Sequence, residues 1–133
     1  MPRLLVVDDD LSITEIYREV LAREGFDVVT APNCAEAMRR MDDHAGDVQV
    51  LLVDLGLPDG DGADFVRTAA AKYGPRPSLY VSGWTDEFWQ MDDAPGRWLI
   101  MRKPVPMRQL VAAVKWLVYG GEKPPELDEP QPS

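Results

Sequence analysis

The sequence is poor in cysteine, histidine and basic residues. Cys34 is the only cysteine, so no disulfide can form within the chain. Lys and Arg number 14 against 23 Asp and Glu, which gives a formal net charge of −9. Because affinity for nucleic acid phosphate depends on clustered Lys and Arg, this balance predicts no direct binding to nucleic acid.

Long apolar runs are missing as well. No stretch reaches the about 18 consecutive apolar residues of a membrane-spanning helix, and the first residues lack the pattern of a secretion signal. These absences predict a cytoplasmic protein without a membrane-inserted segment. What the chain does have is the length and apolar content of one folded domain, with 133 residues of which 45% are hydrophobic.

Short apolar runs alternate with segments of helical period. Several runs are apolar on both faces, as buried parallel strands are. The predicted strands are Arg3–Val7, Phe26–Thr30, Val48–Val53, Ser78–Val81 and Trp98–Met101. This alternation predicts an α/β fold, a flavodoxin-like doubly wound (βα)5 sandwich with a parallel five-stranded sheet in the order 2-1-3-4-5.

Helix signals fall between the predicted strands. Before the first helix, Ser12 followed by Glu15 predicts a capping box, and Gly25 suits the residue after the helix end. The first helix is expected to bury one apolar stripe, made of Ile13, Ile16, Tyr17, Val20 and Leu21. Further helices are predicted after Asn33, over about residues 64–73 and over residues 107–118.

Two segments lack a clear periodic pattern. Between Trp84 and Arg97 the helical period is weak and a Pro-Gly pair follows, so the fourth helix is expected to be short or mobile. After Tyr119 the sequence is rich in proline and acidic residues, which bury too little apolar surface to stay ordered. The predicted organisation is one domain over residues 1–119 and a disordered tail over residues 120–133.

Acidic residues and one lysine stand where predicted strands end. Asp8 and Asp9 follow the first strand, Asp54 the third and Lys103 the fifth. Since the carboxyl ends of parallel strands share one edge of a sheet, these side chains are expected to converge there. Two like charges about 4 Å apart cost roughly 4 kcal/mol at an effective dielectric near 20, so the cluster needs a cation. Hard oxygen ligands favour Mg²⁺, with Mn²⁺ as a possible substitute.

Such a site suits phosphoryl transfer. With a divalent ion held by Asp8 or Asp9 together with Asp54, the Asp54 carboxylate is placed to attack a phosphoryl group as a nucleophile. Lys103 then balances the added charge, and Ser82 at the end of the fourth strand is the candidate hydroxyl.

Four motifs, in this order and at these strand ends, resemble the receiver domain of two-component response regulators. They are Val-Val-Asp-Asp-Asp at 6–10, Val-Asp-Leu-Gly-Leu-Pro-Asp-Gly-Asp-Gly at 53–62, Val-Ser-Gly at 81–83 and Arg-Lys-Pro at 102–104. The resemblance covers roughly residues 2–119. It implies a single-domain switch for a two-component system or phosphorelay rather than a dedicated enzyme.

The resemblance also assigns roles to single residues. It implies that Asp54 is the phosphoacceptor and that Asp8 and Asp9 bind Mg²⁺ directly or through water. The backbone carbonyl of Gly56 is the implied third protein ligand, and Ser82 and Lys103 complete the set. The peptide bond between Lys103 and Pro104 is often cis in the family, which suits the reduced trans preference before proline.

Partners follow from the same resemblance. The phosphoryl donor is expected to be a histidine kinase or a histidine phosphotransfer protein, and the output a contact with an unknown downstream protein. The chain is expected to be a monomer or a weak homodimer. Phosphorylation of Asp54 is thus expected to change protein-protein contacts.

Three residues depart from the family pattern. Ile100 stands where the family has an aromatic residue three positions before the lysine, so this chain lacks at that position the ring that rotates in such receivers. Gly83 follows Ser82 as a small and flexible residue. Trp84 is bulky at the next position, and we hypothesise that it shields the phosphoryl group on Asp54 from water.

Two alternatives stand beside the switch. Asp8, Asp10 and Ser12 resemble the Asp-x-Asp-x-Thr start of haloacid dehalogenase-like phosphatases, with Asp8 as nucleophile and Asp10 as acid and base. That assignment leaves Asp54 without a role. The other alternative is a receiver-like module that only binds. Asp59 and Asp61 lie in a glycine-rich turn. We interpret both as structural, because Asp is common in such turns for local hydrogen bonding.

Overall fold

Parallel strands form the centre of the molecule. The computed structural model describes residues 1–83 and 95–128. The sheet is built from β1 (Arg3–Val7), β2 (Asp27–Ala31), β3 (Val50–Asp54), β6 (Ser78–Ser82) and β7 (Trp98–Arg102). All its pairings are parallel and its order is β2-β1-β3-β6-β7. The predicted order 2-1-3-4-5 is confirmed, with β6 and β7 as the fourth and fifth strands.

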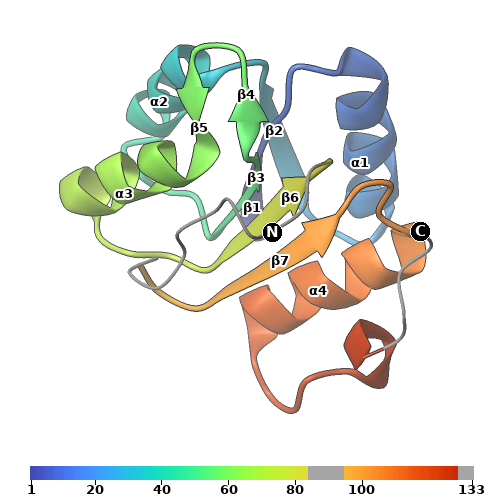
Figure 1. Ribbon diagram of the computed structural model, residues 1–133. Helices are drawn as coiled ribbons and strands as arrows, with labels where there is room; N and C mark the ends of the chain where they lie inside the picture. The colour runs from blue at the N-terminus through green and yellow to red at the C-terminus, as the bar shows by residue number, and fades with distance from the viewer. Residues whose placement is uncertain (84–94, 129–133) are drawn as a thin grey trace.

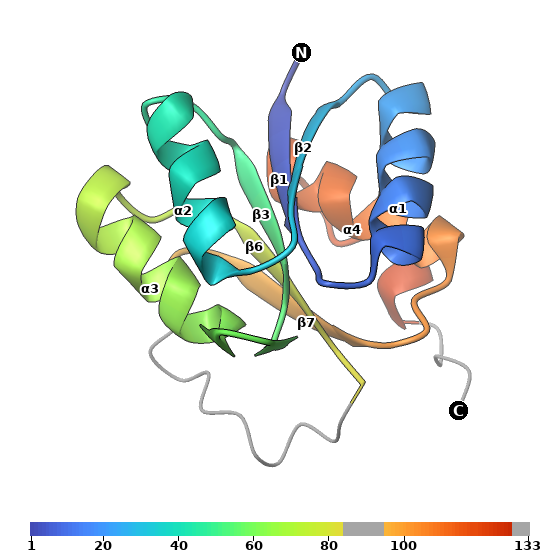
Figure 2. The ribbon, with the colours of Figure 1, turned by 90° about the horizontal axis from the view of Figure 1, so that it is seen from above.

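Helices cover both faces of this sheet (Figures 1 and 2). On one face lie α2 (Cys34–Asp43) and α3 (Gly62–Tyr73), and on the other lie α1 (Leu11–Arg23) and α4 (Met107–Tyr119). Leu5 and Leu51 of the central strands face α2 and α3, while the adjacent Leu4 and Val50 face α1 and α4. This burial on both sides explains why the strands read as continuous apolar runs.

The capping box predicted at Ser12 is wrong. Asp10 is the N-cap of α1, and its carboxylate accepts hydrogen bonds from the backbone N–H groups of Ser12 (3.0 Å) and Ile13 (3.3 Å). Both Asp and Ser suit the N-cap position. Asp10 has the extended backbone of an N-cap residue and the helix begins at Leu11, so the cap lies two residues before Ser12. Ile16 is half exposed rather than part of the buried stripe. In contrast, Asn33 caps α2 at the position after which a helix was predicted. Gly25 has a φ of +92°, the left-handed conformation that suits the predicted glycine after the end of α1.

A small antiparallel hairpin follows β3 and was not predicted. Its strands are β4 (Gly56–Leu57) and β5 (Gly60–Asp61). Asp61 is the N-cap of α3, and Asp59 accepts hydrogen bonds from the N–H groups that open α2, at 2.8 and 3.0 Å. Both residues thus have structural contacts, as predicted, although those of Asp59 reach across the fold.

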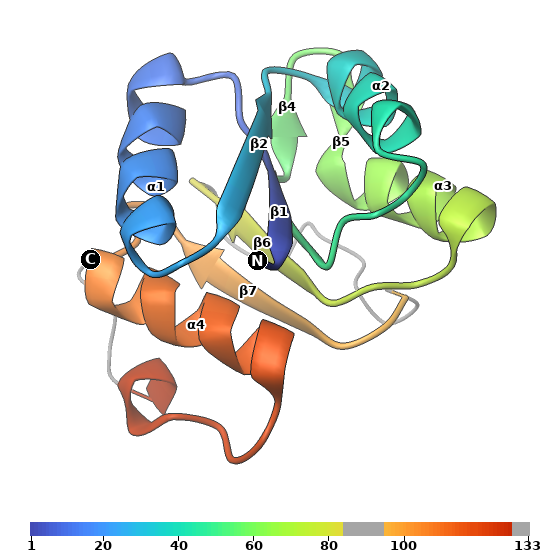
Figure 3. The ribbon, with the colours of Figure 1, turned by 180° about the vertical axis from the view of Figure 1, so that it is seen from behind.

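The chain continues beyond α4 in an ordered path. Residues 125–128 form a 3₁₀ helix, η2 (Pro125–Asp128), which lies against α4 (Figure 3). Leu127 of this segment packs against the apolar cluster that α4 covers, within the range for which the composition predicts disorder. The predicted fourth helix and Trp84 lie in residues 84–94, outside the described part of the chain. Over residues 1–83 and 95–128, no helix is long and apolar enough to span a membrane.

Candidate functional site

The ends of three strands bring Asp8, Asp54 and Lys103 together. Val7 of β1 is paired with Val53 of β3, so the residues that follow them lie side by side at one edge of the sheet. The Lys103 ammonium lies 2.8 Å from Asp8 Oδ2 and 3.0 Å from Asp54 Oδ2. The convergence predicted from the strand ends is confirmed.

Asp8 is the most enclosed carboxylate of the group. It is fully buried, and its Oδ1 accepts a hydrogen bond from the backbone N–H of Asp10 at 2.9 Å. Burial raises the pKa of the Asp8 carboxyl, because water no longer solvates its charge, while Lys103 acts in the opposite direction. The ionised form therefore depends on nearby positive charge.

Asp9 completes a group that suits a divalent cation. Its side chain is exposed, and one carboxylate oxygen each from Asp8, Asp9 and Asp54 lies within 4.8 Å of the others. Lys103 is the cation that contacts two of these three carboxylates, so the group keeps an excess of negative charge. Three hard oxygen donors with one side open to solvent fit Mg²⁺, which retains several of its waters.

Asp54 is held firmly at the end of β3. Its Oδ1 accepts a hydrogen bond from the N–H of Gly56 at 2.9 Å, and its side chain is 9% exposed. On the other side, Gly62 at the start of α3 packs so closely that a Cβ there would overlap the carbonyl oxygen of Asp54. The N–H of Gly56 thus orients the Asp54 carboxylate, while close packing of α3 fixes the Asp54 backbone.

Lys103 is anchored through its backbone as well as its charge. Its N–H donates to the carbonyl of Ser82 at 2.8 Å, which ties β7 to β6 at this edge. The Lys103–Pro104 peptide bond is cis, as the resemblance implied. Burial alone would lower the pKa of Lys103, but its contacts with Asp8 and Asp54 outweigh burial and raise it. The side chain is therefore a permanent cation.

Ser82 and Gly56 lie where the sequence placed them. Ser82 is the last residue of β6 and is buried, and Gly56 is an exposed residue of β4 two positions after Asp54. The roles assigned to the Ser82 hydroxyl and the Gly56 carbonyl stay predictions.

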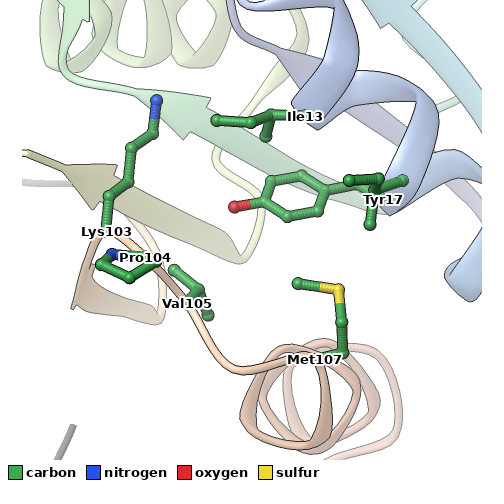
Figure 4. A pocket seen from close by; sticks show the side chains of 7 residues that line it. Ile13, Tyr17, Lys103, Pro104, Val105 and Met107 are labelled. Carbon is green, nitrogen blue, oxygen red and sulfur yellow. The ribbon is translucent and has the colours of Figure 1, made fainter. Parts of the chain in front are cut away.

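An apolar pocket of about 350 Å³ opens beside Lys103. Figure 4 shows the Tyr17 hydroxyl pointing across it toward the Lys103–Pro104 segment. Burial raises the pKa of Tyr17 to about 12, so the phenol stays neutral. The pocket is lined by Ile13, Ile16, Tyr17, Lys103, Pro104, Val105 and Met107. The apolar stripe of α1 was the only sequence signal for it, because the other wall comes from the segment after β7.

Comparisons with known proteins agree with this geometry. The family model described as the response regulator receiver domain matches residues 4–115. The chain is 33% identical over 124 residues to the transcriptional regulatory protein AruR of Pseudomonas aeruginosa, covering 89% of this chain and 50% of that protein. It is 33% identical over 132 residues to the transcriptional regulatory protein KdpE of Mycobacterium tuberculosis, covering 98% and 57%. The chain thus spans about half the length of these relatives.

Solved structures show the same fold. A response regulator receiver domain protein from Clostridium thermocellum superposes with a TM-score of 0.77 at 23% identity, covering 89% of this chain and 94% of that one. The chemotaxis protein CheY4 of Vibrio cholerae gives a TM-score of 0.77 at 22% identity, covering 88% and 98%. At these identities the likeness concerns the fold alone.

Proposed function

The chain belongs to the response regulator receiver domain family, and we propose that it is a signalling switch that accepts a phosphoryl group on Asp54. The observation that supports this most is the position of Lys103, whose ammonium contacts both Asp8 and Asp54 within 3.0 Å. Lys103 can thus neutralise charge added at Asp54. Asp8 is the less accessible carboxylate, because it is fully buried whereas the Asp54 side chain is 9% exposed. This difference in access favours Asp54 over Asp8, the nucleophile of the phosphatase alternative.

Receiver domains bind Mg²⁺ at an acidic pocket, and this chain has the acidic cluster. We assign the ligands to Asp8, Asp9, Asp54 and the carbonyl of Gly56, with Mn²⁺ as a substitute. When bound, the ion offsets the negative charge of the carboxylates and of the phosphoryl oxygens. The three carboxylates give a donor set suited to that ion.

The transfer itself uses the residues at the strand ends. A carboxylate oxygen of Asp54 attacks phosphorus, and the bond between phosphorus and the donor histidine nitrogen breaks, with its electron pair going to the imidazole. The product on Asp54 is an acyl phosphate. Lys103 shifts its contact from the carboxylate toward a phosphoryl oxygen, and the hydroxyl of Ser82 donates to another.

The family implies a histidine kinase or histidine phosphotransfer protein as donor. We propose that the output is a contact with another protein. The relatives AruR and KdpE are named transcriptional regulatory proteins, but they are about twice as long as this chain. The absence of direct nucleic acid binding by this chain, its monomeric or weakly dimeric state and its cytoplasmic location stay predictions.

Incubation with acetyl phosphate and Mg²⁺, followed by mass spectrometry after borohydride reduction, tests the assignment. We expect one phosphoryl group on Asp54, lost in Asp54→Asn and retained in Asp43→Asn, which alters an exposed carboxylate of α2. Modification of Asp8 instead would support the phosphatase alternative. The absence of any modification would leave a binding module and contradict the switch.

A further inference from the structure

The segment after α4 folds back along that helix. Residues 120–128, called here the C-terminal strap, leave the end of α4 and return beside it, so that η2 lies near the first half of α4 (Figures 1 and 3). Composition alone predicted disorder for this segment. Its ordered path therefore needs specific contacts with α4.

Three contacts hold the strap. The Gln109 amide donates from Nε2 to the carbonyl of Glu126 at 3.1 Å, and the Trp116 indole N–H donates to the carbonyl of Gly121 at 3.2 Å. Leu127 packs against the apolar cluster between α4 and the sheet. The strap is thus fastened near both ends of α4.

The covered edge of α4 is buried although part of it is polar. Gln109, Ala112 and Trp116 are spaced by three and four positions and share one side of the helix. Gln109 is 3% exposed and Ala112 is 8% exposed. A buried glutamine amide costs free energy unless it is hydrogen-bonded, and the strap carbonyl of Glu126 accepts the hydrogen bond of its Nε2 group.

The same end of α4 is connected to the candidate site by a short link. Only Pro104, Val105 and Pro106 separate Lys103 from the first residue of α4. The two prolines fix their φ angles, and Val105 is 5% exposed in the cluster that Leu127 also contacts. The first turn of α4, where Gln109 binds the strap, is thus the part of that helix closest along the chain to Lys103.

We propose that docking of the C-terminal strap is coupled to the state of Asp54, an inference that rests on the function proposed above. The strap is docked while Lys103 lies between Asp8 and Asp54. Modification of Asp54 draws the ammonium toward the added oxygens, moves the start of α4 and loosens the strap. Because coupling between two sites is reciprocal, loosening the strap favours the modified state by the same factor.

Beryllofluoride, a mimic of the phosphoryl group, allows both directions to be measured on the full chain. Leu127→Asp places a charge in the apolar contact and should release the strap. Calorimetric titration with Mg²⁺ and beryllofluoride should then show affinity raised by about fivefold, the lower end of typical coupling. Lys123→Gln, which makes the same change in net charge at an exposed strap residue, should titrate like the unaltered chain.

A second variant keeps the test decisive if Leu127→Asp fails to fold. Gln109→Leu removes the hydrogen bond to Glu126 while keeping the side chain about the same size, and it should also raise the affinity for beryllofluoride.

The reverse experiment follows the Leu127 amide, which donates to the carbonyl of Pro124 at 3.1 Å. Its hydrogen exchange in the unaltered chain should accelerate by about fivefold when beryllofluoride binds.

The possible outcomes are distinct. Equal affinity in the unaltered chain and both strap variants, with unchanged exchange at Leu127, would overturn the coupling and leave the phosphoryl site intact. Failure of the unaltered chain to bind beryllofluoride would overturn the proposed function, and the coupling with it. Tighter binding in both strap variants but not in Lys123→Gln supports the coupling.

Discussion

Lys103 and Asp8 form an ion pair in which Nζ lies 2.8 Å from Oδ2 and the carboxylate is fully buried. The lysine side chain is 20% exposed, so solvent screens the pair only in part. Removing one partner of a buried pair costs more than the pair itself contributes, because a buried charge stays behind. Lys103 therefore has a structural role before it has any role in phosphoryl transfer.

Replacement of Lys103 tests this structural role. We expect Lys103→Met to lower the free energy of unfolding by about 3 kcal/mol in urea without Mg²⁺, because Asp8 loses its counter-charge and repels Asp54. Added Mg²⁺ should recover part of the loss. Lys115→Met removes an exposed pair with Glu24 and should cost less than about 1 kcal/mol. An equal loss in the two variants, unaffected by Mg²⁺, would contradict the argument.

The raised pKa of Asp8 makes stability depend on pH. The folded state holds the Asp8 proton more tightly than the unfolded chain, whose carboxyl has its ordinary pKa of 3.8. Between the two pKa values the folded state binds more protons, so the Asp8 contribution to stability falls as pH rises through this window. Above the folded pKa the full cost of the buried charge is present.

Asp8→Asn removes that cost, because the amide is neutral and still accepts a hydrogen bond from the N–H of Asp10. Without Mg²⁺ we expect the variant to gain stability over the unaltered chain as pH rises from 4 toward 7, measured by urea unfolding at several pH values. With Mg²⁺ the order should reverse, since an ion that binds only the folded state stabilises it by about 2.7 kcal/mol at 100 times its Kd. A stability gap that does not change with pH would count against the buried charge.

Gly62 offers a test of how closely α3 fixes Asp54. In Gly62→Ala the added Cβ overlaps the carbonyl oxygen of Asp54, so either β3 or α3 must move. We expect a loss of about 1–3 kcal/mol in stability and slower phosphorylation by acetyl phosphate in the folded fraction. Gly83→Ala is the control, because no described atom lies within 4 Å of its added Cβ. Normal phosphorylation kinetics in Gly62→Ala would show that the end of β3 tolerates the shift.

Much of the candidate site could be predicted because it follows from strand ends. Asp8, Asp54 and Lys103 stand directly after buried apolar runs, and parallel strands place such residues at one edge. The choice of N-cap was harder, since Asp10 and Ser12 are both good caps. Only the path of the chain out of β1 decides between them.

Contacts between distant segments could not be predicted from local patterns. Gly62 looks like one more glycine of a turn until the fold brings it against Asp54. The C-terminal strap has one large apolar residue, Leu127, and its composition is that of a disordered tail. Leu127 is ordered by a surface that α4 presents after folding, and a sequence window around residues 120–128 does not contain that surface.

Arg76 is a further residue whose importance appears only in three dimensions. Its guanidinium donates to the carbonyls of Val48 at 2.8 Å, Gly74 at 2.7 Å and Gly46 at 3.0 Å. These carbonyls belong to the loops that lead into β3 and β6, at the opposite end of the sheet from Asp54. Arg76 thus stabilises the far edge without contact with the site.

We expect Arg76→Ala to lower the free energy of unfolding by about 3 kcal/mol, because several charge-assisted hydrogen bonds are lost together. Arg76→Lys should recover only part of this, since an ammonium cannot reproduce the planar guanidinium fork. Urea unfolding measures both effects. In the folded fraction, the rate of phosphorylation by acetyl phosphate should equal that of the unaltered chain. A slower rate at equal folded concentration would mean that the loops before β3 and β6 influence Asp54, and that stability and phosphoryl acceptance are not separable in this fold.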